Sequence, residues 1–211
     1  MSRLPGLVMQ RDGLARLPAT ALEFGYLVRA CRPGDENTWH DIGEGRPLLG
    51  WTAARFSREV LNSRDFDPSG LFFVTYGSRP AGVACAWKRS GGGKVGELRF
   101  LAVKKSHRGK GLGSFLVVKV LEYLRKAGCR SCEARLNVSQ ARALKALLSL
   151  GFRPACAGRG DKARWQRALR RIGAGGATAA KVRPDHKPDS HTGGEGHTHG
   201  RRNREGQRAR H

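Results

Sequence analysis

The sequence predicts an α/β protein that combines antiparallel β-hairpins with alternating strands and helices. First, the chain has 211 residues, of which 39% are hydrophobic, and this is enough for one well-packed domain with an appendage. This composition excludes a wholly disordered or collagen-like chain. Second, β-rich runs joined by turn sequences between residues 71 and 103 predict antiparallel hairpins. Third, strand-like and helix-like segments alternate from residue 103 onward, which is typical of an α/β arrangement.

The first half of the chain is expected to contain strands and helices in turn. The expected strands are 26–31, 71–76, 81–87 and 97–103, and the expected helices are 36–42 and 52–61. Asp35 stands where a residue would cap the first helix. The turn Gly77-Ser-Arg-Pro joins two of the strands, and glycines 91–93 provide the next turn.

The second half alternates more regularly. The expected elements are a helix at 112–124, a strand at 129–138, a helix at 140–150 and a strand at 152–157. The first of these helices is apolar nearly all round, so we expect it to be packed on more than one side. Trp165, Leu169 and Ile172 then follow at helical spacing and predict a final helix, with a strand as the alternative.

Composition divides the chain into an irregular extension at 1–23, a folded domain at 24–172 and a disordered basic tail at 173–211. The tail is rich in Arg, His and Gly and has almost no large apolar residues, so it cannot bury a core. The formal charge of +23 divides into +19 for residues 1–172 and +4 for the tail. The positive field therefore belongs to the folded part, where it attracts phosphorylated ligands, nucleic acid or acidic lipid surfaces.

Cysteine usage and the absence of targeting signals indicate a cytoplasmic protein. No apolar run approaches the roughly 20 residues that span a bilayer, and the first residues lack the apolar core of a secretory signal. The five cysteines are expected to be reduced thiols. Cys129 and Cys132 are three positions apart in an expected strand and so point to opposite faces, which argues against a metal site.

A loop rich in Arg and Gly, Arg108-Gly-Lys-Gly-Leu-Gly113, joins the strand at 97–103 to the helix at 112–124. Its three glycines allow backbone conformations that expose successive N–H groups. These donors lie at the positive end of a helix dipole, where anions bind, and Arg108 and Lys110 add positive charge. The loop is therefore predicted to bind a phosphate or diphosphate.

Two common phosphate-binding loops do not fit this spacing. The nucleotide-hydrolase loop needs G-x-x-x-x-G-K-[ST], and the dinucleotide loop needs G-x-G-x-x-G, which is one residue longer than the glycine spacing found here. Arg108-x-x-Gly111-x-Gly113, directly after Leu101-Ala-Val103, resembles instead the coenzyme A loop of the GNAT family of N-acetyltransferases. Leu150-Gly-Phe152 resembles the end of that family's late helix and its entry into the next strand.

The resemblance implies a three-layer fold whose twisted mixed sheet is splayed between its fourth and fifth strands, with about four flanking helices. It also implies an enzyme that transfers an acetyl group from acetyl-CoA to an amine of a small molecule or protein, without a metal. Pantetheine would lie in the splay beside Leu101 and Val103, and an amide near Val103 would polarise the thioester carbonyl. The cofactor-binding residues implied are Leu101, Ala102, Val103, Arg108, Gly109, Lys110, Gly111, Leu112, Gly113 and Ser114.

Glu97 is the candidate catalytic base. By the period-two rule it shares a face with Arg99, Leu101 and Val103, and its position resembles the strand glutamate of the branch that acetylates protein lysines. The alternative is a solvated residue that opens a strand. The sequence departs from the family at Leu147, where a tyrosine commonly protonates the departing thiolate. Either water takes that role or turnover is weak.

A second function class stays open at this point: a GNAT-fold module that binds acyl-CoA, RNA or the ribosome with weak or no turnover. The basic surface and tail motivate this hypothesis, but the aromatic–basic interleaving that stacks bases is missing. A third alternative is that the basicity reflects an Arg-rich proteome and no partner. No membrane partner is expected, and the sequence allows either a monomer or a homodimer.

Overall fold

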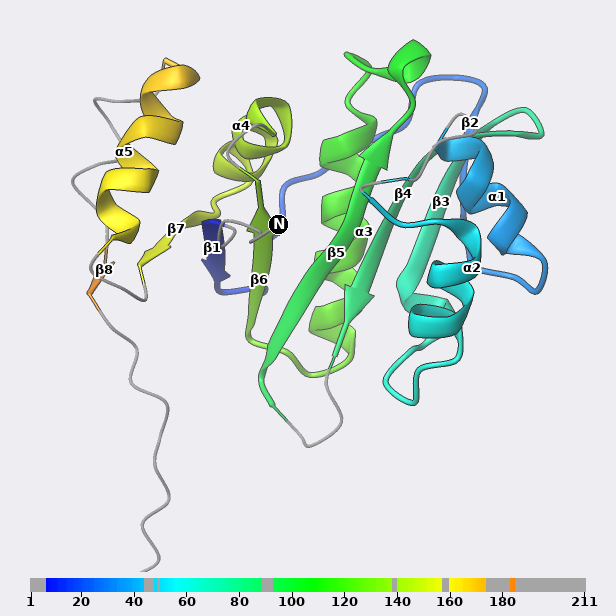
Figure 1. The fold of residues 1–211 in the computed structure, drawn as a ribbon, viewed down its shortest axis with the longest axis horizontal. Helices are drawn as coiled ribbons and strands as arrows, with labels where there is room; N and C mark the ends of the chain where they lie inside the picture. Colours follow the sequence, from blue (N-terminus) through cyan, green and yellow to red (C-terminus); the bar gives the residue numbers. More distant parts are fainter. Residues whose placement is uncertain are drawn as a thin grey trace, which may run out of the picture.

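The structure is a computed structural model, and the described residues form one sheet with helices on both faces (Figure 1). It describes residues 7–43, 48, 50–88, 93–137, 140–156 and 160–173, together with the backbone of 183–184. The tail expected at 173–211 lies outside the described residues, except for Gly173 and the two residues that extend the sheet. The expected disorder of the tail stays a prediction.

The sheet has eight described strands in the order β2-β3-β4-β5-β6-β1-β7-β8. Neighbours are antiparallel except for the pairs β5–β6 and β7–β8, so the predicted mixed sheet is confirmed. The strands are β1 (Leu7–Asp12), β2 (Tyr26–Ala30), β3 (Leu71–Tyr76), β4 (Arg79–Trp87), β5 (Val95–Val103), β6 (Ser131–Leu136), β7 (Arg153–Cys156) and β8 (Arg183–Pro184).

Helices cover both faces of this sheet, which confirms the three-layer α/β prediction. Helices α1 and α2 pack on one face, and α3 and α4 pack on the other (Figure 1). The helices are α1 (Asp35–Ile42), α2 (Ala53–Phe56) with a π-helical continuation (Ser57–Leu61), α3 (Leu112–Lys126), α4 (Ala141–Ser149) and α5 (Asp161–Arg171). The segment around Trp165 is thus a helix and not a strand.

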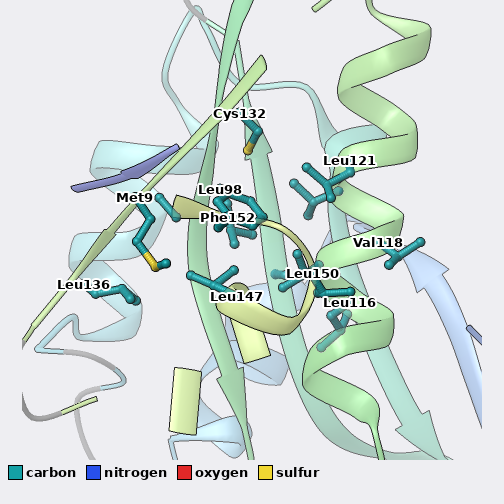
Figure 2. Packing of buried hydrophobic residues seen from close by; sticks show 14 of the residues in the cluster. Met9, Leu98, Leu116, Val118, Leu121, Cys132, Leu136, Leu147, Leu150 and Phe152 are labelled. Carbon is teal, nitrogen blue, oxygen red and sulfur yellow. The ribbon is translucent and has the colours of Figure 1, made fainter. Parts of the chain in front are cut away.

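The core around α3 agrees with its apolar sequence. Eight α3 residues are buried, and they form one cluster with side chains from β5, β6, α4 and β1. Figure 2 shows Leu116 and Leu121 of α3 opposite Leu147 of α4 and its C-cap residue Leu150. Because α3 is packed on several sides, the loop that enters it is attached to a rigid element.

Asp35 does not cap α1 as expected. Gly34 is the N-cap residue, with φ 92°, and Asp35 is the first residue of the helix. Its buried carboxylate accepts hydrogen bonds from the Arg29 guanidinium, the Arg32 N–H and the Thr38 hydroxyl. Burial disfavours the charged form, but these donors outweigh it and lower the pKa of Asp35. Asp35 therefore links β2 to the start of α1 through these hydrogen bonds.

The expectation of an irregular extension at 1–23 is wrong for Leu7–Asp12. This segment is β1, which inserts between β6 and β7 and pairs antiparallel with both. Leu7 and Met9 are buried in the α3 cluster, and Figure 2 shows Met9 beside Leu136 of β6. β1 is therefore part of the folded domain, although it precedes residue 24.

Arg11 of β1 also fixes the end of α4. Its guanidinium donates hydrogen bonds to the carbonyl of Leu150, which is the C-cap residue of α4, and to the carbonyl of Arg16 at 2.8 Å. Carbonyls in the last turn of a helix have no partner within the helix, so this side chain satisfies one of them. The first strand of the chain thus stabilises two later elements, α4 and β7.

Gly96 allows α3 to pack directly on β5. A Cβ added at Gly96 would lie 2.4 Å from Leu124 Cδ2 and 2.9 Å from Leu124 Cγ, and Leu124 is fully buried. We expect Gly96→Val to lower the free energy of unfolding by about 1–3 kcal/mol, because overpacking forces α3 away from the sheet. Chemical denaturation measures this change. Gly93→Val is the matched control, since a Cβ there meets nothing within 4 Å, and equal losses in both variants would contradict the packing argument.

No helix in the described part of the chain is both long and apolar enough to cross a membrane. All five cysteines are free thiols. Burial raises the pKa of Cys85 to about 12 and also raises that of Cys132, which keeps both thiols protonated at neutral pH. Among the described residues, no group of three or more His, Cys, Asp or Glu side chains is placed to hold a metal ion.

Candidate functional site

The sheet opens between β5 and β6. Val95–Leu98 of β5 pairs in parallel with Ser131–Ala134 of β6, but no pairing joins the two strands beyond Leu98. β5 continues along β4 as far as Val103, and Figure 1 shows β5 diverging from β6 toward the end that leads into α3. The splay expected between the fourth and fifth strands of the domain is confirmed. It lies between β5 and β6 in the observed numbering because β1 precedes them.

A β-bulge lies in β5 where this split begins. The register with β4 shifts between Val83 and Cys85, and Phe100 opposite has φ 56°, which is rare for a bulky residue. After the bulge, the N–H of Lys104 donates to the Ala81 carbonyl at 2.8 Å, and Ala102 is in register with Val83. The backbone groups of Ala102 therefore face β4.

The backbone groups of Val103 face the other way, toward the split. In an antiparallel pair, hydrogen-bonded and non-hydrogen-bonded residues alternate, and Val103 lies between the two residues whose backbone faces β4. The structure thus turns the main chain of one predicted cofactor-binding residue, Val103, toward the split, and Leu101 lies two residues before it, at the bulge. Ala102, between them, faces β4 instead.

The bulge also overturns the expectation that Glu97 shares a face with Leu101 and Val103. Leu98, Leu101 and Val103 all pack on the α3 side of the sheet, although an unbroken strand would put Leu98 and Leu101 on opposite faces. Arg99 covers the Trp87 ring at 4.2 Å on the α1–α2 side, and Glu97 bonds to Arg99. Glu97 therefore lies on the opposite face from the side chains of Leu101 and Val103.

The loop before α3, residues 108–113, has the geometry of an anion site, and we call it the anion loop. Gly109 and Gly111 have φ angles of 85° and 73°, which only glycine adopts readily, and Gly111 is the N-cap residue of the 15-residue helix α3. A Cβ at Gly113 would meet nothing within 4 Å, so the N-terminus of the helix is open. The first-turn N–H groups and the helix dipole favour an anion here. Leu112, by contrast, points into the core.

An aromatic cluster of Tyr26, Tyr76 and His107 packs against this loop. His107 Nδ1 lies 2.8 Å from the Tyr26 hydroxyl, and both rings contact Tyr76. Lys110 Nζ lies 5.4 Å from the centre of the Tyr26 ring, and the Tyr26 hydroxyl raises the pKa of Lys110. Partial burial, together with the charges of Lys110 and Lys104, lowers the pKa of His107. His107 is therefore a supporting residue of the loop, and it lies away from Glu97.

Glu97 itself is three-quarters or more buried and points along the face that α1 and α2 partly cover. Its side chain is 17% exposed, and its carboxylate lies 2.7 Å from an Arg99 guanidinium nitrogen. The Cα partner of Glu97 on β6 is Glu133, which belongs to the last paired residues before the split. A carboxylate at this point is adjacent to the place where β5 and β6 separate.

The sequence did not predict the group of aromatic side chains on the α1–α2 face of the sheet. Phe100 contacts the rings of Trp39, Trp51 and Phe56, and Arg55 stacks over Trp51 at 4.1 Å. Phe100 can reach these rings because the bulge turns it toward α1 and α2. An apolar Phe in a strand carries no signal for a positive φ, so the sequence offered no way to find this arrangement.

No tyrosine takes the expected acid position. Leu147 is fully buried in the α3 cluster, where Figure 2 shows it among Leu98, Leu150 and Phe152. Tyr123 donates a hydrogen bond to Asp67, and burial raises its pKa. The remaining tyrosines of the chain, at 26 and 76, belong to the aromatic cluster under the loop. The side chains at the split therefore include no phenol.

Comparison with known proteins agrees with this geometry. A profile of the acetyltransferase (GNAT) family matches residues 37–152, which is more than half of the chain. Two curated relatives, both named mycothiol acetyltransferase, come from Acidothermus cellulolyticus and Thermomonospora curvata. They are 31% and 30% identical over 70% and 72% of this chain. The matches cover 50% and 53% of those proteins, so the chain spans about half the length of these curated relatives.

Solved structures support the fold. A GCN5-related N-acetyltransferase from Sphaerobacter thermophilus superimposes with a TM-score of 0.59 and 21% identity, covering 72% of this chain and 49% of that one. A tandem GNAT protein from the clavulanic acid biosynthesis pathway gives a TM-score of 0.54 and 20% identity, covering 72% and 51%. With the split sheet, the β5 bulge and the anion loop in place, the chain belongs to the GNAT family of acetyltransferases.

Proposed function

We propose that this chain transfers an acetyl group from acetyl-CoA to a primary amine by direct attack within a ternary complex. The observation that carries the proposal is the placement of the split beside the anion loop. A diphosphate on the open N-terminus of α3 puts the attached pantetheine next to the backbone of Val103 and Leu101. The family membership and the names of the curated relatives support the same reaction.

The separation between Glu97 and each backbone amide of β5 indicates which N–H polarises the thioester. Glu97 and Val103 are six residues apart, which is about 20 Å in an extended strand, too far for one carboxylate to serve an amine reacting at the Val103 amide. Leu101 is two residues nearer and lies at the bulge, where the split begins. We therefore assign to Leu101 N–H the stabilisation of negative charge on the thioester oxygen, and to the Val103 carbonyl a hydrogen bond from pantetheine.

Glu97 removes the proton that the amine must lose, directly or through one water. Its bond to Arg99, which is itself stacked on Trp87, holds the carboxylate in one orientation at the start of the split. The acceptor then approaches on the α1–α2 face, against Phe100 and Trp51. Since the split has no phenol, water protonates the departing thiolate.

The anion loop gives the direct test of acetyl-CoA binding. We expect Gly113→Leu to leave the free energy of unfolding unchanged, because a Cβ there meets no atom within 4 Å and Leu favours a helix. The new side chain covers the helix N-terminus, so acetyl-CoA affinity should fall by about 100-fold or more. For the wild type, acetyl-CoA at about 100 times its Kd should stabilise the fold by about 2.7 kcal/mol, seen as a Tm rise of several degrees.

The matched control is Gly160→Leu, another open glycine, which stands at the start of α5. It should bind acetyl-CoA like the wild type. The proposal fails if the wild type shows no thermal shift with acetyl-CoA, or if Gly113→Leu binds as tightly as the control. A steeply salt-dependent shift with RNA, without any response to acetyl-CoA, would instead indicate the binding module.

A further inference from the structure

Helix α5 has a buried apolar face and an exposed basic face. Trp165, Ala168 and Leu169 are buried in the α3 cluster, and Trp165 Nε1 donates a hydrogen bond to the Ala155 carbonyl of β7 at 3.3 Å. Three arginines of α5 are exposed, and we call them the α5 arginines: Arg167, Arg170 and Arg171. They are three and four residues apart, so they share the side of the helix that points away from the sheet.

The α5 arginines have no acidic partner in the described part of the chain, because every ion pair found there joins other residues. Within α5 itself, Asp161 pairs with Arg164. The 11 residues of α5 include five basic residues and one acidic residue, which gives a formal charge of +4. Guanidinium groups bond bidentately to phosphate and are weakly hydrated, so unpaired arginines on one face favour a phosphate-bearing partner.

A second basic segment starts from the same part of the sheet. β8 pairs in parallel with β7, the strand that Trp165 of α5 contacts (Figure 1). Beyond β8, residues 201–210 have the sequence RRNREGQRAR, with five arginines and one glutamate. Basic segments of this kind bind nucleic acid. Both segments therefore favour a polyanion that is longer than one coenzyme.

We propose that the exposed face of α5 binds the phosphate backbone of double-stranded DNA, at a surface separate from the acetyl-CoA site. α5 is about 16 Å long at about 1.5 Å per residue. Double-stranded DNA has one negative charge per about 1.7 Å of its axis, so about ten charges lie along this length, about twice as many as on a single strand. The aromatic residue of α5, Trp165, is buried, so the helix has no exposed ring on which unpaired bases stack.

Two other anionic partners fit α5 less well. An RNA duplex has a deep, narrow major groove that side chains do not enter, whereas the major groove of DNA is about 12 Å wide and admits a helix. Membrane-surface helices bury their apolar face among the lipids, but the apolar face of α5 is already packed in the core. The binding is expected to be independent of DNA sequence, since phosphate contacts carry no sequence information.

The triple variant Arg167→Gln/Arg170→Gln/Arg171→Gln tests this surface in the full chain. Its Tm should not change, because glutamine has a helix propensity close to that of arginine. Fluorescence anisotropy of a labelled DNA duplex of about 20 base pairs measures the affinity between about 0.05 and 0.2 M salt. At about 0.1 M salt the affinity should fall by about 100-fold or more, and the slope of log affinity against log salt should become shallower by about 2.7, because three phosphate contacts are lost. Arg167→Gln alone should change the slope by about 0.9.

The matched control is Arg32→Gln/Arg64→Gln/Arg79→Gln, which makes the same change of net charge on exposed arginines outside the described ion pairs. Arg32 follows β2, Arg64 lies in the connection to β3, and Arg79 begins β4, toward the other end of the sheet. Its DNA affinity should stay close to that of the wild type. Saturating acetyl-CoA should also leave the DNA affinity unchanged, because the anion loop follows β5, which β6 and β1 separate from β7.

The inference is wrong if the wild type does not bind the duplex at about 0.05 M salt, or if both triple variants lose affinity equally, which would indicate an effect of net charge alone. It is also wrong if single-stranded DNA, duplex RNA or phosphatidylserine vesicles bind as tightly as duplex DNA. Displacement of the duplex by acetyl-CoA would locate the binding at the anion loop and would overturn the inference too. None of these results bears on acetyl transfer, which the thermal shift with acetyl-CoA tests separately.

Discussion

Replacing Glu97 by glutamine is expected to lower kcat by about 10²- to 10⁴-fold, the range that removal of a general base usually produces. Glutamine preserves the volume and still bonds to Arg99, but it cannot accept a proton from the acceptor amine. The Kd for acetyl-CoA should not change, because Glu97 lies on the α1–α2 face and the donor lies along the backbone of Leu101 and Val103. Steady-state kinetics with a pool of primary amines and labelled acetyl-CoA measure kcat, and thermal shift measures donor binding.

Glu133→Gln is the matched control for this prediction. Glu133 is the Cα partner of Glu97 on β6 and pairs with Arg135 at 4.0 Å, so the substitution makes the same change of charge on the adjacent strand. Its kcat should stay close to that of the wild type. If the two variants lose activity equally, a general field effect explains the loss, and if Glu97→Gln keeps its turnover, Glu97 is not the base.

The anion loop was predictable because its geometry is local. Glycines at 109 and 111 determine the backbone of the loop, Gly113 leaves the helix N-terminus open, and the apolar pattern of 112–124 specifies the helix, so residue types and spacing sufficed. Leu101 and Val103 were placed for the same reason: they immediately precede this loop in β5. The prediction needed no information about distant parts of the chain.

The orientation of Glu97 could not be predicted because it depends on one residue that breaks the alternation. The period-two rule holds only for an unbroken strand, and the bulge at Phe100 shifts every later side chain to the other face. What favours the bulge is tertiary: Phe100 packs among Trp39, Trp51 and Phe56 from helices and loops far away in the sequence. The residue types of β5 themselves show no preference for the bulged conformation.

β1 was missed for a related reason. Leu7 and Met9 alternate with Val8 and Gln10 as a half-buried strand should, but the run is short and has no hairpin partner nearby. Its partners, β6 and β7, begin more than a hundred residues later. Sequence patterns identify a strand best when its neighbour is a turn away, so a single strand paired only at long range resembles an irregular extension.

Removing residues 1–13 should therefore abolish cooperative folding. The deletion takes two core side chains, each worth about 2–5 kcal/mol on truncation, from a fold whose total stability is typically about 5–15 kcal/mol. It also removes both hydrogen-bonded ladders of β1, leaving β6 and β7 with exposed edges, and the Arg11 bonds to the end of α4. Circular dichroism during thermal unfolding should show no sigmoidal transition for residues 14–211.

The contrasting truncation removes residues 185–211 and keeps every described element, so its Tm should match that of the full chain. Met9→Ala, a milder change within β1, should lower the free energy of unfolding by about 2–5 kcal/mol and keep the transition cooperative. A cooperative transition near the wild-type Tm in the 14–211 chain would show that β6 and β7 close the sheet without β1. α4 packs on α3, and Arg11 of β1 holds the end of α4. If the chain needs β1 to fold, then it also needs β1 to keep α3 rigid, and the anion loop depends on a rigid α3.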